Sequence, residues 1–179
     1  MAKRHTTAPN WEDFRHFFKR ETIPARTVLL KEGEVSERMY YIEQGCIRLS
    51  FNKDGKDITF QFFFEGEGVS SAESFRSGEP SLFRIESIEP CIIQTLNKKD
   101  CQTMIKASPA IKEELEEQTF QRLMYYQKLF LSRIKNSPEE RYQELLQHNP
   151  HILQRVPQHY IASFLGITSV SLSRIRNRR

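Results

Sequence analysis

The chain has 179 residues, of which 38% are hydrophobic and 28% are charged, so it is long enough for one or two domains with a sizeable core. No apolar run approaches the roughly 20 residues that span a bilayer, and the first residues lack the apolar core of a signal peptide. We therefore expect a cytoplasmic protein without a membrane partner. The three cysteines, Cys46, Cys91 and Cys101, have no CxxC spacing, which argues against a disulfide framework or a metal site built from cysteines alone.

The N-terminal half of the chain is predicted to form short strands. Asn10 is expected to cap a first helix over residues 11–20, and six of the seven glycines then lie between Gly33 and Gly78. Glycine-punctuated sequence favours short antiparallel strands, and Asp54-Gly55 is a strong hairpin signal. Such a pattern favours a jelly roll or sandwich over residues 23–97. The expected strands cover residues 27–30, 39–43, 47–51, 58–64, 83–88 and 92–96.

A helical region is predicted to follow the strands. Asn97 and Asp100 indicate a short capped helix, and Ser108-Pro109 opens a long helix over residues 111–134. This long helix is apolar on two sides, so it needs two partners. We expect the roll and the same helix of a second subunit, because helix-turn-helix proteins usually bind DNA as symmetric dimers; the alternative is burial within one chain. The residues assigned to the dimer interface are Leu115, Leu123, Tyr126, Phe130 and Ile134.

The C-terminal segment predicts a helix-turn-helix. A capping box at residues 137–140 starts a helix that runs to Leu146. Pro157 suits the first turn of another helix, whose apolar residues are Ile161, Ala162, Phe164 and Leu165. Gly166 suits the left-handed turn that ends this helix, and Thr168 is a good N-cap for a second one with Leu172 and Ile175 buried. Two short helices joined by a tight glycine turn make a helix-turn-helix.

This end of the chain is strongly basic. Residues 151–179 contain five arginines and no Asp or Glu, whereas the whole chain carries a net charge of +4. A cationic tip on a near-neutral body is the footprint expected for DNA phosphates; a basic helical hairpin without a DNA role is the alternative. Arg174 is assigned to a base edge, and Arg176 and Arg179 to phosphates. The other residues expected on or beside the outward face of this helix are Ser169, Val170, Ser171, Ser173 and Arg178.

The order of roll, long helix and helix-turn-helix resembles the Crp/Fnr superfamily of bacterial transcription regulators, in a branch common in Bacteroidetes-type bacteria. The resemblance is carried by LLKEGEVSERMYYIEQGCIRL (29–49), by FFFEGE, AESF and GEPS within 62–81, by SPEERYQELL (137–146), and most specifically by RVPQHYIASFLGITSVSLSRIR (155–176).

The resemblance implies an α+β fold of three parts. A cyclic-nucleotide-binding-like double-stranded β-roll (jelly roll) with an N-terminal helix is expected over residues 1–107, and a dimerisation helix over 108–136. A helix-turn-helix DNA-binding domain of the winged-helix type is expected over 137–179. The family's wing hairpin would begin near Arg179, where the sequence ends, so we expect a wing that is short or absent.

Two departures from the family pattern concern ligands and DNA. Members that bind cyclic nucleotide hold the ribose with a Glu after a Gly, as in Gly66-Glu67, and the phosphate with a later Arg, which falls here on Ser81. Because a serine cannot reproduce the bidentate grip of a guanidinium, cyclic AMP is not expected to bind. The residues expected around any effector pocket are Glu67, Ser70, Ser71, Ser81 and Arg84. The Arg and Glu that often start the reading helix fall on Ser169 and Val170, so the operator should differ, and Val170 could contact a thymine methyl group.

No other cofactor is expected. Residues 23–97 contain no histidine, which argues against a haem-bearing roll and against a cupin-type metal site. The iron–sulfur sensors of this superfamily need four cysteines, and the chain has three.

The sequence therefore favours a dimeric, sequence-specific DNA-binding transcription regulator whose roll senses an unknown effector. Its expected partners are double-stranded DNA and a second copy of the chain, with RNA polymerase as a further candidate. A second hypothesis is a nucleotide- or protein-binding module whose helix-turn-helix is vestigial. An enzyme of the cupin or jelly-roll type is the weakest hypothesis, because the sequence has no His/Glu metal cluster, nucleophile elbow or P-loop.

Overall fold

Two four-stranded antiparallel sheets form the roll in this computed structural model, which describes residues 10–177. The first sheet has the order β1 (Lys19–Ile23), β8 (Cys91–Asn97), β3 (Arg38–Gln44) and β6 (Gly68–Val69). The second sheet has the order β2 (Val28–Leu30), β7 (Arg84–Ser87), β4 (Ile47–Lys53) and β5 (Lys56–Phe63). The sheets face each other across an apolar interior, so the jelly-roll prediction is confirmed.

Alternation along the strands fills that interior. On β4, Ile47 and Leu49 point into the roll, and on β7, Ile85 does the same. Their neighbours Arg48 and Arg84 therefore project from the opposite, outer face of the second sheet. The buried residues of the interior are Leu30, Tyr40, Ile42, Ile47, Leu49, Phe63, Val69, Ile85, Cys91 and Ile93.

The turn between β4 and β5 follows its sequence signal. Asp54 has φ 53° and Gly55 has φ 79°, so both central residues have positive φ, as a type I′ turn requires. The strands pair from Ile47↔Phe63 to Lys53↔Lys56, with one irregularity between Leu49 and Ser50. Asp54-Gly55 therefore fixes the register of this hairpin, as expected.

The first element differs from the prediction. A short 3₁₀ helix covers Trp11–Phe17, and Lys19–Ile23 is strand β1 rather than the end of a helix. This strand pairs with β8 from Lys19↔Thr95 to Ile23↔Cys91, a long-range contact that local spacing does not reveal. Strand β6 and helix α1 (Ala72–Ser77) were likewise not predicted.

In the part of the chain that the structure describes, six helices follow the roll, and the caps of the first three match the expected ones. Asn97 accepts a hydrogen bond from the Asp100 backbone, Ser108 accepts one from Ile111, and Ser137 forms the complete capping box with Glu140. Helix α5 was not predicted. The helices are α2 (Lys98–Ala107), α3 (Pro109–Lys135), α4 (Pro138–His148), α5 (Pro150–Arg155), α6 (Gln158–Leu165) and α7 (Ser169–Asn177). Among the residues the structure describes, none of the helices is both long and apolar enough to cross a membrane.

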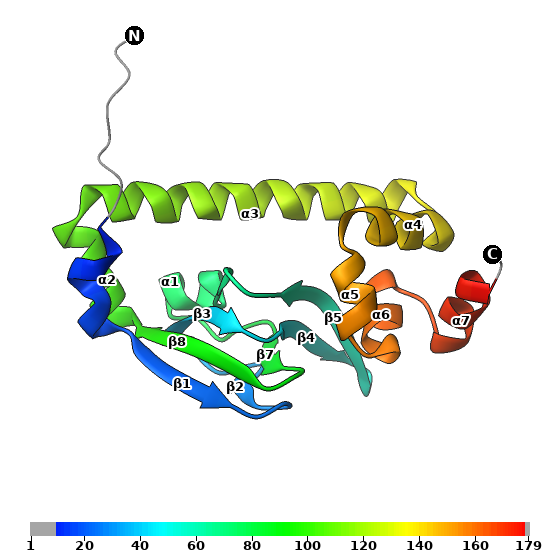
Figure 1. The fold of residues 1–179 in the computed structure, drawn as a ribbon, viewed down its shortest axis with the longest axis horizontal. Helices are drawn as coiled ribbons and strands as arrows, with labels where there is room; N and C mark the ends of the chain where they lie inside the picture. The colour runs from blue at the N-terminus through cyan, green and yellow to red at the C-terminus, as the bar shows by residue number, and fades with distance from the viewer. Residues whose placement is uncertain (1–9, 178–179) are drawn as a thin grey trace, which may run out of the picture.

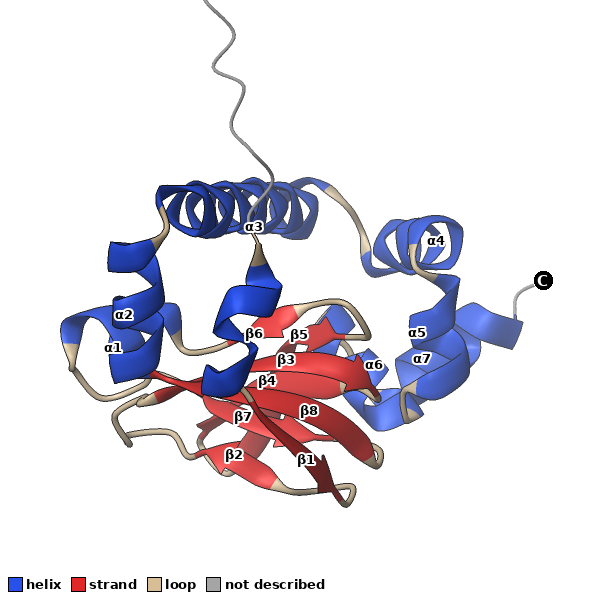
Figure 2. Cartoon of the chain, turned by 60° about the vertical axis from the view of Figure 1, so that its left-hand side comes forward, coloured by secondary structure: helices blue, strands red, loops and turns tan. Residues whose placement is uncertain are grey.

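Helix α3 runs along the roll, and the C-terminal helices gather at its far end (Figures 1 and 2). There, α6 packs on β5, with the Phe62 and Phe164 ring centres 5.4 Å apart. One core cluster therefore joins the roll to the C-terminal helices, although the sequence suggested separate domains. Its buried members are Cys46, Phe62, Phe64, Tyr142, Leu145, Ile152, Val156, Ile161, Ala162, Phe164, Leu165 and Leu172.

Candidate nucleic-acid interface and its support

Helices α6 and α7 form the predicted helix-turn-helix. Gly166 ends α6 in the left-handed region with φ 71°, and its backbone N–H bonds to the end of the helix. The Thr168 hydroxyl accepts a hydrogen bond from the Ser171 backbone at 3.1 Å, which makes Thr168 the N-cap of α7. Leu172 is buried and Ile175 is half-buried against the same core. Pro157 is the N-cap of α6 rather than its first residue.

The outward face of α7 is open to solvent. The residues on it that are exposed are Ser169, Val170, Ser173, Arg174 and Arg176. Val170 is 61% exposed, although it is apolar. Neither Arg174 nor Arg176 has a salt-bridge partner among residues 10–177. Arg178 and Arg179, which the sequence also assigned to DNA, lie outside the described residues.

Ser171 differs from the others on this helix. It is half-buried, and its hydroxyl lies 3.0 Å from the Thr168 hydroxyl. Its backbone N–H and its hydroxyl therefore both contact the cap residue, which leaves it less accessible than Ser169 or Ser173.

Two arginines hold the C-terminal end of α6. Arg133 of α3 donates to the Phe164 carbonyl, and Arg141 of α4 donates to the Leu165 carbonyl at 2.7 Å. The last carbonyls of a helix have no partner within the helix and carry partial negative charge, so cations stabilise them. Burial and the neighbouring Arg141 lower the pKa of Arg133. The helix-turn-helix is thus attached directly to the long helix.

The opposite side of α6 lies on the roll. The Ser163 hydroxyl accepts a hydrogen bond from the Thr59 backbone at 2.9 Å and donates to the Asp57 carbonyl at 3.2 Å. The Tyr160 ring covers the Arg48 guanidinium, 4.0 Å from the ring centre. Ser163 thus bonds to the free edge of β5, the outermost strand of its sheet.

Arg48 is a buried cation on the outer face of the sheet. Only 1% of it is exposed, and its guanidinium bonds to Asp57, Glu86 and Thr59. Although burial disfavours its charge, the hydrogen bonds that Arg48 donates to Asp57 and Glu86 raise its pKa. All of these hydrogen-bond acceptors belong to the roll, whereas the Tyr160 ring that covers the guanidinium belongs to the C-terminal helices.

A second ion cluster joins α5 to the roll. The Arg155 guanidinium bonds to both carboxylate oxygens of Glu65, at 2.7 and 2.8 Å, and also to Glu89. It lies 5.0 Å from the centre of the Phe64 ring. The hydrogen bond from Arg155 lowers the pKa of Glu65 to about 2, and the same bond raises the pKa of Arg155.

The residues expected around an effector pocket are only partly brought together. Ser71 and Ser81 are both buried, and their hydroxyls are 2.8 Å apart, while the Ser81 hydroxyl also donates to the Phe83 carbonyl. Ser70, the residue before Ser71, is half-buried. Glu67 accepts from the Phe64 backbone at 2.8 Å and from Arg122 of α3 at 3.2 Å. Instead of a cation, position 81 of the roll has a serine whose hydroxyl is already hydrogen-bonded within the protein.

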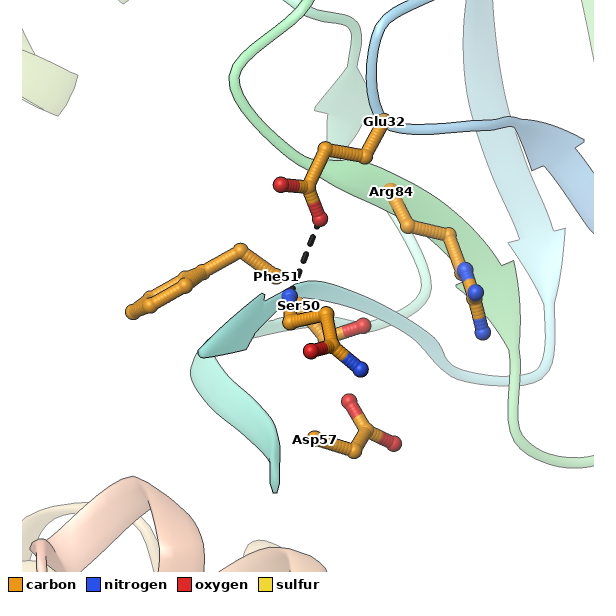
Figure 3. Close-up of a pocket in the computed structure, with 6 residues that line it drawn as sticks. Glu32, Ser50, Phe51, Asp57 and Arg84 are labelled. Atoms are coloured by element: carbon orange, nitrogen blue, oxygen red, sulfur yellow. Dashed lines mark hydrogen bonds between the residues drawn. The ribbon is translucent and has the colours of Figure 1, made fainter. Parts of the chain in front are cut away.

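Arg84 does not belong to this group, which corrects the sequence assignment. It projects from the outer face because its neighbour Ile85 points inward. Arg84 is the cross-strand partner of Ser50. Both line a hollow of about 70 Å³, together with Glu32, Phe51, Asn52 and Asp57 (Figure 3). The Glu32 carboxylate accepts a hydrogen bond from the Asn52 backbone there. Neither Glu67 nor Ser81 lines this hollow.

The long helix divides its apolar residues between two sides. Leu123, Phe130 and Ile134 are 58%, 64% and 65% exposed, whereas Tyr126 is half-buried. Leu115 packs against the cluster of Leu96, Cys101, Met104 and Ile111 in the same chain. Leu115 is half-buried in its own chain, and its assignment to the dimer interface stays a prediction. Phe120 and Leu131, which were not assigned, are also exposed on α3.

Among residues 10–177, no group of three His, Cys, Asp or Glu side chains is placed to hold a metal ion.

The residues that sequence reasoning missed are Arg48, Tyr160 and Ser163. Two features of the sequence could have indicated them. Arg48 lies between two inward-pointing residues of a strand, and Ser163 is a polar residue within the apolar stretch 160–165.

Comparisons with known proteins agree with this architecture. Residues 20–108 match the family model of the cyclic nucleotide-binding domain. The chain is 28% identical over 101 residues to the cAMP-activated global transcriptional regulator CRP of Pasteurella multocida, covering 56% of this chain and 48% of that protein. It is 23% identical over 118 residues to the CRP of Salmonella typhimurium, covering 65% and 56%. The chain thus spans about half the length of these curated relatives.

Solved structures share the fold over more of the chain. The c-di-GMP responsive global regulator CLP of Xanthomonas campestris has a TM-score of 0.75 at 18% identity, covering 92% of this chain and 87% of that one. FixK2 of Bradyrhizobium japonicum has a TM-score of 0.78 at 16% identity, covering 90% and 83%.

The class that the fold defines is a cyclic nucleotide-binding-type roll followed by a long helix and a helix-turn-helix. Residues 20–108 of the chain match a cyclic nucleotide-binding domain, and its sequence is similar to CRP regulators of the Crp/Fnr superfamily. Its branch within the superfamily stays a prediction.

Proposed function

We propose that this protein is a dimeric, sequence-specific regulator of transcription that reads double-stranded DNA with α7. The observation that carries the proposal is the open face of that helix. Arg174 and Arg176 are exposed on it beside Ser169 and Ser173, and neither has an acidic partner within the described range 10–177. Arginine forks and serine hydroxyls on an accessible helix are the groups that read base edges and phosphates in the major groove.

Helix α3 supplies the dimer contact in this proposal. Leu123, Phe130 and Ile134 are large apolar side chains, each more than half exposed. Exposed apolar residues along one helix favour association with the same helix of a second copy, since a two-fold axis makes such a surface self-complementary. A second copy would also present a second α7 to a palindromic operator.

The roll does not bind cyclic AMP in this proposal, and the protein has no cofactor and is not an enzyme. The support is Ser81, whose hydroxyl is already bonded to Ser71 and to the Phe83 carbonyl. A buried phosphate without a guanidinium would be an uncompensated charge. Any effector must therefore differ chemically from cyclic AMP. RNA polymerase is a candidate partner at the promoter.

The test is binding to DNA at several salt concentrations. Fluorescence anisotropy with random duplexes, followed by selection of a preferred site from a random pool, measures both non-specific and specific affinity. We expect affinity to fall steeply with salt, because each neutralised phosphate contributes about −0.9 to the logarithmic slope, and one selected palindrome to bind at least tenfold tighter than scrambled duplex. A protein that binds no duplex at low salt would leave the alternative, a binding module with a vestigial helix-turn-helix.

A further inference from the structure

Helix α6 is held by the roll and by the long helix at the same time. Its residues Tyr160, Ser163 and Phe164 lie at i, i+3 and i+4, so they form one face, and that face contacts Arg48, Thr59 and Phe62 of the roll. Its last two carbonyls accept from Arg133 and Arg141. These contacts restrain α6 on one face and at its C-terminal end.

The docked arrangement leaves the reading face free. Ser169, Val170, Ser173, Arg174 and Arg176 stay exposed while α6 lies on β5. An autoinhibitory contact would cover these residues, and the roll instead contacts the first helix of the motif. Docking therefore fixes the direction in which α7 points without blocking it.

The ion-pair network at the docking surface of the roll is complete without the helices. Arg48 bonds to Asp57, Glu86 and Thr59, all within the roll, so removing α6 leaves no unpaired buried charge. The contacts of the C-terminal helices that would be lost are the aromatic packing of Phe62 and Tyr160, the two hydrogen bonds of Ser163, the ion pairs of Arg155 in α5, and the apolar cluster that covers Cys46 and Phe64. Together these contacts hold the reading helix in one orientation relative to α3.

We propose that docking of α6 on the roll sets the separation between operator half-sites that this protein accepts, with Tyr160, Ser163 and Phe164 as positioning residues. This inference rests on the proposed function, because it needs a dimer that binds DNA. Two reading helices in a dimer must be about 34 Å apart to enter successive major grooves on one face of the duplex. The orientation of each α7 relative to α3 determines that distance, and contacts of α6 with the roll determine the orientation.

The two docking variants change residues of the roll and leave the reading helix α7 unaltered. Phe62→Ala removes the ring that packs on Phe164, and the double variant Glu65→Gln with Glu89→Gln weakens the hold on Arg155. Tyr160→Phe keeps an aromatic ring over Arg48 and serves as one matched control. Lys56→Ala, an exposed change on the same strand β5, serves as the other.

Anisotropy is measured on a single half-site and on duplexes whose two half-sites are separated by one helical turn, or by that distance plus or minus two and five base pairs. We expect the wild type and both controls to lose at least tenfold in affinity at a five-base-pair shift. The docking variants should lose less than threefold at the same shift, while their half-site affinity stays within threefold of wild type. Sedimentation must show that they remain dimers.

Three outcomes overturn the inference. Docking variants that keep the wild-type spacing preference show that the roll does not set it. If both variants lose half-site affinity as well as spacing preference, the substitutions have a general effect on folding. If the variants are monomers, the effect comes from loss of the dimer. If the wild type binds no duplex, the proposed function itself is wrong, which is a distinct result.

Discussion

The Tyr160 ring of α6 lies over the Arg48 guanidinium of β4, with 4.0 Å between the guanidinium carbon and the ring centre. Arg48 projects from the outer face of a sheet, yet it is 1% exposed. This cation can be buried because two carboxylates and an aromatic ring surround it. The carboxylates belong to the roll, and the ring belongs to the helix-turn-helix.

Removing the ring should destabilise the whole protein. A desolvated cation–π contact contributes about 2 kcal/mol, and loss of a largely buried aromatic side chain adds to it, so Tyr160→Ala should lower the free energy of unfolding by about 2–4 kcal/mol. Tyr160→Phe should change it by less than about 1 kcal/mol. Urea unfolding followed by circular dichroism measures both, and equal effects of the two variants would contradict the role of the ring.

The two described arginines of α7 should differ in kind. Arg174→Ala should cost about 1–3 kcal/mol on the selected operator and relax the preference at one position. Arg176→Ala should weaken all sequences alike and reduce the salt slope by about one. Both variants are measured on the operator and on scrambled duplex across a salt series. If Arg176→Ala changes the sequence preference while Arg174→Ala does not, the assigned orientation of α7 is reversed.

Charges on the exposed face of α3 should separate the dimer. Phe130→Glu with Ile134→Glu places two carboxylates where a second copy would pack, and monomers are expected at micromolar concentration. Stability should change little, because both side chains are more than half exposed in the single chain. Analytical ultracentrifugation is the measurement, with Lys128→Glu as the control, because Lys128 is exposed on a different face of the same helix. A wild type that sediments as a monomer while binding a palindrome tightly would refute the interface.

Cyclic AMP should give no binding heat. Isothermal titration calorimetry at micromolar protein tests this, since a ligand held by an arginine fork would show clear enthalpy. A separate measurement tests the hydrogen bonds of Ser81 within the roll. Ser81→Ala removes the bonds to Ser71 and Phe83 and should lower the free energy of unfolding by about 1–2 kcal/mol. Micromolar or tighter binding of cyclic AMP would show that the cassette is aligned wrongly.

The pair of Glu65 and Arg155 predicts a dependence on acid pH. Arg155 holds the pKa of Glu65 at about 2, below its ordinary value of 4.5. A carboxyl whose pKa is lowered by folding stabilises the folded state above 4.5 and loses that effect as the pH falls toward 2. The difference in stability between wild type and Glu65→Gln should therefore be constant from pH 6 to 8 and shrink below pH 4.5.

Because the carboxylate is partly exposed, solvent screening should limit this difference to less than about 1 kcal/mol. Thermal unfolding over pH 3–8 is the measurement. A difference that grows as the pH falls would mean that the neutral carboxyl, not the carboxylate, is the stabilising form.

Features that depend on neighbours in sequence could be predicted. The Asp54-Gly55 turn, the capping box at Ser137, and the Gly166 and Thr168 signals of the helix-turn-helix are all found where expected, because backbone conformation and cap hydrogen bonds involve residues within four positions. Strand β1 could not be found in this way. Its residues Lys19–Ile23 are ordered by β8, about 70 residues later.

The candidate site was predictable in part for the same reason. The outward face of α7 follows from helical spacing once Leu172 is buried. The support of that face depends on pairs such as Thr59 and Ser163, which are 104 positions apart. Arg84 was placed in the wrong group because its nearness in sequence to Ser81 says nothing about the side of the sheet to which it points.

The packing of Phe62 against Phe164 also bears on how the chain is made. These two residues are about 100 positions apart in the sequence, and a ribosome adds roughly 5–20 residues per second. The strands of the roll thus leave the ribosome several seconds before the helix that covers their outer face. During that interval Phe62 and Phe64 of the nascent chain face solvent, beside the free edge of β5. Chaperone binding to the newly made roll is expected to end when residue 165 emerges.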